Sequence, residues 1–209
     1  MAYNQVHIPG ANARGTNFVV CEDRVYIIHG DACLVLDPAT GEDVAEINLP
    51  LPEQERPVWG YLGVQDDILV AGFGGVRYSD YLKSASDNSI DSDKDLDATS
   101  SRSIVAFNRY TGAVLWTCHS RLGFRHNAIA LGGDRLFCVD ALPGPVQEVL
   151  ERRGRTPSGT PTLYSLDLKT GRPVWVEDGR TFGTWLGYSK EFDILRSEEH
   201  TSELQSRQS

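Results

Sequence analysis

The side chains best suited to acid–base chemistry stand next to each other in FRHN, residues 124–127. His126 is the strongest single candidate because an imidazole titrates near neutral pH, and Arg125 would act beside it. The sequence identifies no nucleophile or carboxylate near this pair. The catalytic residues therefore stay unknown, with His126 and Arg125 as weak candidates, and a hydrogen-bonded structural histidine is the competing interpretation.

Alternating carboxylates in DSDKDLD, residues 91–97, resemble the start of a calcium-binding loop. Calcium prefers oxygen ligands, and Asp91, Asp93 and Asp95 would supply them. The sixth position of such a loop, normally glycine, is Leu96, and the twelfth, normally glutamate, is Arg102. A Ser- and Asp-rich segment with few apolar residues is more simply a solvated loop. The sequence therefore predicts no metal site, with the three aspartates as a weak candidate.

Composition argues against several classes of function. The 209 residues carry a formal net charge of −9, whereas binding to nucleic acid relies on clustered Lys and Arg. No apolar run approaches the ~20 residues that cross a membrane, and the start MAYNQVHIPGANARG lacks the features of a signal peptide. The four cysteines form no CxxC motif and lie among apolar residues, which predicts small hydrophobic side chains. We therefore expect no nucleic-acid partner and no membrane span.

A repeated turn indicates how the chain is organised. NRYTGAVLW at 108–116 recurs as DLKTGRPVW at 167–175 and, less well preserved, as DPATGEDVA at 37–45. In each copy an apolar strand ends in Asp or Asn, whose side chain can accept a backbone hydrogen bond in an Asx-turn. The following Thr-Gly supplies a glycine with positive φ, which closes a bulged hairpin. Trp116 and Trp175 are predicted to begin the buried face of the outgoing strand.

A second pair of strands precedes each of these hairpins, in residues 17–30, 61–72 and 127–140. Each unit therefore consists of four antiparallel strands, and serial four-stranded sheets are typical of an all-β propeller. We expect a partial β-propeller of about three blades, 14–50, 58–120 and 124–178, with a fourth starting at 182–195. A β-sandwich is the alternative. Insertions are expected at 73–102 and at 143–159, the latter as a short helix with Val146, Val149 and Leu150 on one face.

The pattern strand-D-x-x-TG-x-x-x-W resembles the pyrroloquinoline-quinone (PQQ) repeat of PQQ-like β-propellers. RGTNFVV, GFRHNAIA and FGTWLGYS are most similar to large uncharacterised bacterial propellers of this family. The resemblance implies a bacterial, periplasmic or extracytoplasmic protein. In the family's dehydrogenases, PQQ stacks between a tryptophan and a vicinal disulfide over calcium. This sequence has no adjacent cysteines, so we expect no cofactor, with PQQ and calcium only as an implication of the resemblance.

The two ends of the sequence suggest a fragment. Propellers of this family have more blades, and open sheet edges tend to pair with other chains. We therefore expect the remaining blades of a longer chain to be partners. RSEEHTSELQS, residues 196–206, resembles a translated sequencing adapter. We expect residues 1–195 to be the propeller fragment and residues 196–209 a non-native tail.

The segments that begin the innermost strand of each blade are expected to converge on the propeller axis. Their polar and aromatic side chains would form a funnel that suits a small ligand. The set consists of Arg14, Asn17, Trp59, Tyr61, Arg125, His126, Asn127, Trp185 and Tyr188. The competing interpretation is that these side chains pack between blades.

Three functions are compatible with these features. We favour a non-catalytic binding or scaffold module that takes a protein or small-molecule ligand on the propeller face or in the axial funnel. A PQQ-dependent oxidoreductase is the alternative that the resemblance implies. The third is an axial-pocket enzyme in which Arg125 and His126 act on a small molecule or glycan.

Overall fold

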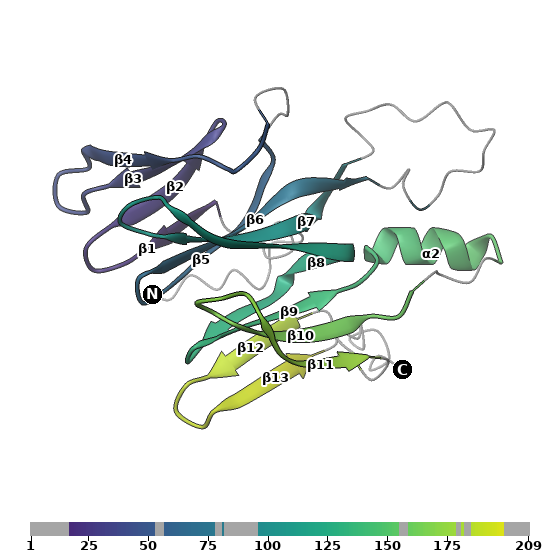
Figure 1. Ribbon diagram of the computed structural model, residues 1–209. Helices are drawn as coiled ribbons and strands as arrows, with labels where there is room; N and C mark the ends of the chain where they lie inside the picture. The colour runs from purple at the N-terminus through teal and green to yellow at the C-terminus, as the bar shows by residue number, and fades with distance from the viewer. Residues whose placement is uncertain are drawn as a thin grey trace, which may run out of the picture.

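The computed structural model describes residues 17–52, 57–77, 81, 96–154, 159–178, 181 and 185–198. Strands dominate these residues, and Figure 1 shows them as successive antiparallel sheets. The first sheet has the order β1-β2-β3-β4. Its strands are β1 (Phe18–Val20), β2 (Val25–His29), β3 (Ala32–Leu36) and β4 (Asp43–Ile47). This meander forms the first blade.

The next two blades share one seven-stranded sheet. Its strands are β5 (Trp59–Gln65), β6 (Ile68–Arg77), β7 (Leu96–Asn108), β8 (Val114–Gly132), β9 (Arg135–Asp140), β10 (Thr162–Asp167) and β11 (Pro173–Asp178). They lie side by side in chain order. The long strand β8 belongs to both blades, because its first part pairs with β7 and its second part with β9.

A two-stranded sheet, β12 (Trp185–Ser189) and β13 (Ile194–Glu198), begins a fourth blade. The fold is therefore a partial β-propeller of three four-stranded blades and the start of another. This confirms the predicted fold class and disfavours the sandwich. Strand β13 pairs through Glu198 opposite Trp185, three residues into the segment that resembles adapter sequence. Among the described residues, no helix is long and apolar enough to cross a membrane.

The Thr-Gly turn has the same structure in all three blades, as the sequence predicts. The Oδ1 atoms of Asp37, Asn108 and Asp167 accept hydrogen bonds from the backbone N–H three residues on, at 2.8–3.0 Å. The glycines that follow have φ of 73°, 70° and 69°. The strand register shifts at the end of the incoming strand in each copy. These local bonds specify the geometry of the hairpin.

The first prediction concerns acid stability. Backbone hydrogen bonds from Thr40 and Ala39 lower the pKa of Asp37, and the hydroxyl and N–H of Thr170 lower that of Asp167. A carboxyl whose pKa is lowered by folding stabilises the fold above its unfolded pKa of about 4, and this contribution is lost as the pH falls through the folded value. Asn108 shows that an amide fits this turn.

The double variant Asp37→Asn/Asp167→Asn should therefore have a free energy of unfolding that depends less on pH below about pH 4 than the wild type. Urea titrations at a series of pH values measure this slope. An unchanged slope would show that the two turns do not contribute to acid unfolding.

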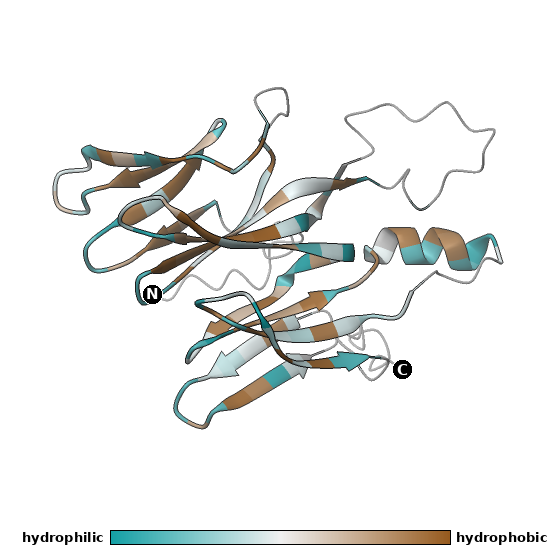
Figure 2. Cartoon of the chain, in the orientation of Figure 1, coloured by the Kyte–Doolittle hydropathy of each residue, from teal (hydrophilic) through white to brown (hydrophobic). Residues whose placement is uncertain are grey.

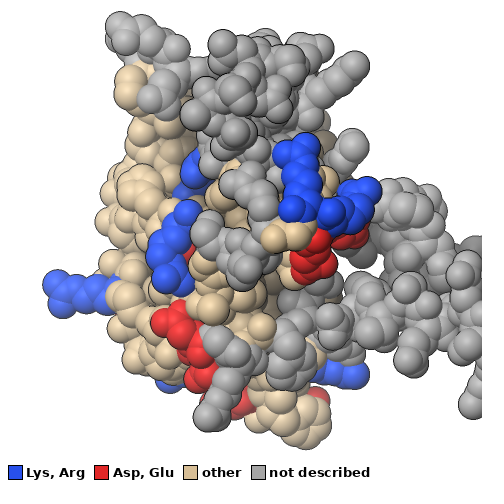
Figure 3. All heavy atoms as spheres, turned by 90° about the vertical axis from the view of Figure 1, so that its right-hand side faces the viewer, with Lys and Arg blue, Asp and Glu red and all other residues tan. Residues whose placement is uncertain are grey.

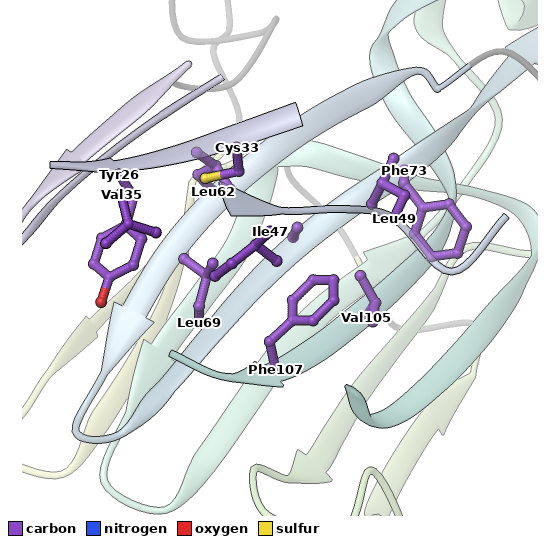
Figure 4. Packing of buried hydrophobic residues seen from close by; sticks show 11 residues of the cluster. Tyr26, Cys33, Val35, Ile47, Leu49, Leu62, Leu69, Phe73, Val105 and Phe107 are labelled. Atoms are coloured by element: carbon purple, nitrogen blue, oxygen red, sulfur yellow. The ribbon is translucent and has the colours of Figure 1, made fainter. Parts of the chain in front are cut away.

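The hydrophobic core lies in the seams between neighbouring blades. Figure 4 shows the first seam, where Tyr26 and Ile47 of the first blade face Leu69 and Phe107 of the second. A second cluster packs between the second and third blades, and a third cluster joins Phe137 to Leu186 of the fourth. Figure 2 shows apolar residues running along the strands of every blade. Each blade therefore buries its apolar faces against its neighbours.

Trp116 and Trp175 differ in burial although they occupy the same position in their repeats. Trp116 is buried, and its indole N–H donates to the carbonyl of Leu168 in the next blade at 2.8 Å. Trp175 is 37% exposed, so its predicted burial is wrong within the described part of the chain. Among the described residues, no Thr-Gly turn covers Trp175 as the turn at 168–171 covers Trp116. A blade's tryptophan is thus buried by the following blade.

The two ends of the strands are built differently. At one end, which we call the hairpin end, tight turns join β1 to β2, β5 to β6, β8 to β9, β10 to β11 and β12 to β13 (Figure 1). The other, the insertion end, carries the connections from β6 to β7 and from β9 to β10. Helix α2 (Gly144–Arg152) lies in the latter and buries Val146 and Leu150 against Leu122. The predicted short helix is confirmed.

Candidate functional site

The segments that begin the innermost strands lie at the insertion end, but their side chains mostly contact the preceding blade. Arg14, Asp91, Asp93 and Asp95 lie outside the described residues. Asn17 is exposed, and its backbone carbonyl accepts a hydrogen bond from the N–H of Ile28 at 2.8 Å.

His126 lies in the seam between the second and third blades. Its Nε2 atom is 2.7 Å from the Oγ of Ser101 on β7, and the two residues are 4% and 1% exposed. A β-carbon on Gly60 would lie 2.4 Å from that oxygen and 2.5 Å from that nitrogen. A hydroxyl beside an imidazole is the arrangement of an activated nucleophile. Here, however, the backbone of β5 closes over the pair and leaves no room for a substrate.

Arg125 points to a different set of groups than its neighbour. Its guanidinium lies 3.7 Å from the carboxylate of Asp97 and 3.3 Å from the Oγ of Ser100, to which it donates. Asp97 is buried and accepts hydrogen bonds from the N–H and hydroxyl of Thr99. Asp97, the last aspartate of DSDKDLD, therefore pairs with Arg125 and accepts hydrogen bonds within its own turn. Within the described ranges, no three His, Cys, Asp or Glu side chains are grouped closely enough to hold a metal ion.

Trp59 and Tyr61 of β5 face two different seams. The indole N–H of Trp59 donates to the carbonyl of Asp31 in the first blade at 2.9 Å. Tyr61 packs with the cluster between the second and third blades, and burial raises its pKa to about 12. A phenol with this pKa stays protonated at neutral pH, so Tyr61 supplies no base. Both aromatic residues therefore join blades.

Trp185 and Tyr188 belong to β12 of the fourth blade. The ring of Tyr188 stacks on Phe137 with centroids 5.5 Å apart, and its hydroxyl donates to Asp193 at 2.6 Å. A β-carbon on Gly132 would overlap this ring. Trp185 is 37% exposed and lies over Gly187 of its own strand. Tyr188 thus closes the third seam, whereas Trp185 remains accessible.

Asn127 completes the polar group at the start of the third blade. Its Oδ1 atom is buried and has no hydrogen-bond partner among the described residues. The structure therefore brings Arg125, His126 and Asn127 together with Asp97, Ser100 and Ser101. It does not place Trp59 or Tyr188 with them, because each lies in another seam. The axial funnel itself remains a prediction.

Sequence reasoning missed Asp140, whose side chain accepts three backbone hydrogen bonds at this end. Its carboxylate accepts the backbone N–H groups of Arg121, Leu122 and Gly123 at 2.7–2.8 Å, and it is 1% exposed. These three residues carry β8 from one blade to the next. An aspartate that ends an apolar strand, FCVD, is the only signal the sequence offers.

Charges of both signs are interspersed on the insertion end, as Figure 3 shows. Arg121 is 55% exposed and lies 3.6 Å from Asp178 and 3.8 Å from Asp140. Arg152 and Arg153 are exposed at the end of helix α2. The insertion end therefore offers accessible cations beside the buried polar cluster.

The described residues do not fit the PQQ site that the family resemblance implies. That site needs a disulfide between adjacent cysteines. All four cysteines are free thiols, and Cys33 and Cys138 are fully buried in blade cores. Trp59 and Trp116 are engaged in seams through their indole N–H groups. The described residues therefore offer no disulfide between adjacent cysteines on which a quinone could stack.

Comparison with known proteins gives likenesses of fold alone. No protein-family model matches the chain, and no curated protein matches it. The quinohemoprotein alcohol dehydrogenase from Comamonas testosteroni is similar over 79% of this chain and 28% of its own, with 14% identity and a TM-score of 0.45. A chain of a mitotic checkpoint complex is similar over 83% of this chain and 41% of its own, with 10% identity and a TM-score of 0.48. This chain spans less than half the length of either.

Proposed function

We propose that this chain is part of a non-catalytic β-propeller module that binds a protein partner or a ligand through its insertion end. The observation that carries the proposal is the buried pair of Ser101 and His126, at 2.7 Å and at most 4% exposed. His126, the best candidate for acid–base chemistry, therefore joins two blades through this hydrogen bond. The polar residues of the site act as structural bonds rather than as reacting groups.

The insertion end supplies a surface for binding. Both long connections leave the sheets there, and longer connections on a rigid scaffold are where binding residues are usually found. Arg152, at the end of helix α2, and Arg153, which caps it, are exposed, while Val146 and Leu150 pack the helix against Leu122. The seams below keep this surface rigid, which reduces the entropy lost on binding.

The two enzyme hypotheses receive less support. The PQQ-dependent oxidoreductase lacks adjacent cysteines, and the axial-pocket enzyme would need a solvent-accessible His126. A periplasmic or extracytoplasmic location follows from the family resemblance alone and is part of the proposal. The partner class we propose is a protein or small molecule with acidic groups that would pair with Arg152 and Arg153. These exposed cations stand beside the exposed Glu148 and Glu151.

Charge reversal tests this proposal. Proteins retained by the tagged full chain would be identified by mass spectrometry, and each would be purified and titrated against the variants. Arg152→Glu/Arg153→Glu should weaken binding about tenfold or more, whereas Arg172→Glu at the hairpin end should not. Equal binding by both variants would contradict the proposed surface. Turnover of any substrate that disappears in His126→Ala, with the fold retained, would contradict the non-catalytic assignment.

A further inference from the structure

A cavity of about 400 Å³ lies at the hairpin end, on the opposite side of the blades from the proposed binding surface. It is formed where the β5–β6, β8–β9, β10–β11 and β12–β13 turns meet. Ile68 and Leu168 form its apolar floor, and both are buried. Its charged lining consists of Asp66, Asp67, Asp134, Lys169 and Lys190. The volume is that of a small-molecule site.

The equivalent position between the first and second blades shows what this space accommodates. Asp23, Asp67 and Asp134 occupy equivalent positions in the first three blades. In each blade the aspartate directly precedes the residue that lies opposite the Asx-turn residue on the neighbouring strand. Asp23 is bound by Arg109 of the second blade at 2.9 Å. The same guanidinium donates to the hydroxyl of Tyr26 at 3.2 Å and stacks on Tyr110. An arginine side chain therefore fills the first seam.

The second seam has the same backbone but lacks this side chain. The N–H of Arg109 donates to the carbonyl of Asp67 at 3.0 Å, and the N–H of Leu168 donates to that of Asp134 at 2.8 Å. Leu168 thus occupies the position of Arg109, and it cannot reach or neutralise a carboxylate. No described residue donates a side-chain hydrogen bond to Asp67, and Asp66 is bonded only to Gln65. The cavity borders Asp67 and Leu168, which are the counterparts of Asp23 and Arg109.

The lining of the cavity also carries positive charge. Lys169 stands at the position of Tyr110, and Lys190 comes from the β12–β13 turn of the fourth blade. Both side chains are exposed. A ligand that carries both a cation and a carboxylate could therefore pair its cation with Asp67 and its carboxylate with a lysine ammonium of the same lining.

We propose that this cavity binds a small basic amino acid, with its guanidinium on Asp67 and its carboxylate on Lys190. The apolar floor accommodates the methylene chain. Asp67 stands at the position of Asp23, which binds the Arg109 guanidinium in the first seam. The hydroxyl of Tyr26 has no counterpart in the second seam, where Val70 takes its position. The inference does not depend on the function proposed above, because the two sites lie at opposite ends of the blades.

Calorimetric titration of the full chain with L-arginine tests the inference. Saturable binding is expected, and it should be about tenfold weaker for citrulline, which keeps the shape and loses the charge. It should weaken similarly for agmatine, which lacks the carboxylate. Asp67→Asn should lower the affinity about tenfold, whereas Asp43→Asn, an equal change of charge on exposed β4, should not.

A filling variant gives an independent result. Leu168→Arg introduces the side chain that occupies the first seam, so arginine binding should disappear while the circular dichroism spectrum of the sheets is retained. If this variant does not fold, the affinities of Asp67→Asn and Asp43→Asn for L-arginine still test the proposal. No saturable binding of L-arginine, equal affinity for citrulline, or equal loss in both aspartate variants would overturn the proposal.

Discussion

Replacing Asp140 with alanine should lower the free energy of unfolding by about 3 to 5 kcal/mol. The carboxylate accepts three consecutive backbone N–H groups, those of Arg121, Leu122 and Gly123, and it is 1% exposed. Alanine would leave these three donors without an acceptor, those of Leu122 and Gly123 buried, and each unsatisfied buried donor costs about 1 to 3 kcal/mol. Urea denaturation followed by circular dichroism measures the change.

Two controls separate this effect from a general loss of charge. Asp178→Ala removes a carboxylate that is 61% exposed and should change stability by less than about 1 kcal/mol. Asp140→Asn keeps an acceptor oxygen and should fall between the other two variants. If Asp140→Ala were no more destabilised than Asp178→Ala, the crossing of β8 between blades would not depend on this side chain.

Replacing Gly171 with alanine should lower the free energy of unfolding by about 2 to 4 kcal/mol. The residue has φ of 69°, which an L-residue with a β-carbon adopts at a cost of about 1 to 2 kcal/mol. In addition, the new β-carbon would lie 2.6 Å from the indole of Trp116, and this ring is buried. The tryptophan would have to leave the seam to make room.

Gly41→Ala is the matched control, since the same substitution occurs in the same turn. Gly41 has φ of 73°, and a β-carbon added there would meet no described atom within 4 Å. It should therefore show the backbone cost alone, about 1 to 2 kcal/mol. Equal destabilisation of the two variants in urea titrations would mean that Trp116 does not pack under the following blade.

The fold could be predicted because the repeated signals are local. Asp37, Asn108 and Asp167 bond to N–H groups within three residues, so the sequence of each turn specifies its geometry. Once the turn recurs, the number and order of strands follow. The burial of Trp175 could not be predicted in this way, because a blade's tryptophan is covered by the turn of the next repeat.

The candidate site was predictable only in part. Strand alternation places Arg125 and His126 on opposite sides of β8, but their partners lie on a different strand, β7. Ser101 and Asp97 meet them through the irregular pairing of β7 with β8, where the register shifts. A bulge of this kind leaves little signal in the sequence. The cavity at the hairpin end was missed because it arises from a difference between repeats, leucine at 168 where the preceding copy has Arg109.

The arrangement of the blades is tested most directly by nuclear Overhauser effects from the indole N–H and ring protons of Trp116. We predict contacts with Leu168 and with the α-protons of Gly171 in the following blade, together with slow exchange of the indole N–H. Contacts confined to the tryptophan's own blade, with rapid exchange of that proton, would contradict the packing of each blade against the next.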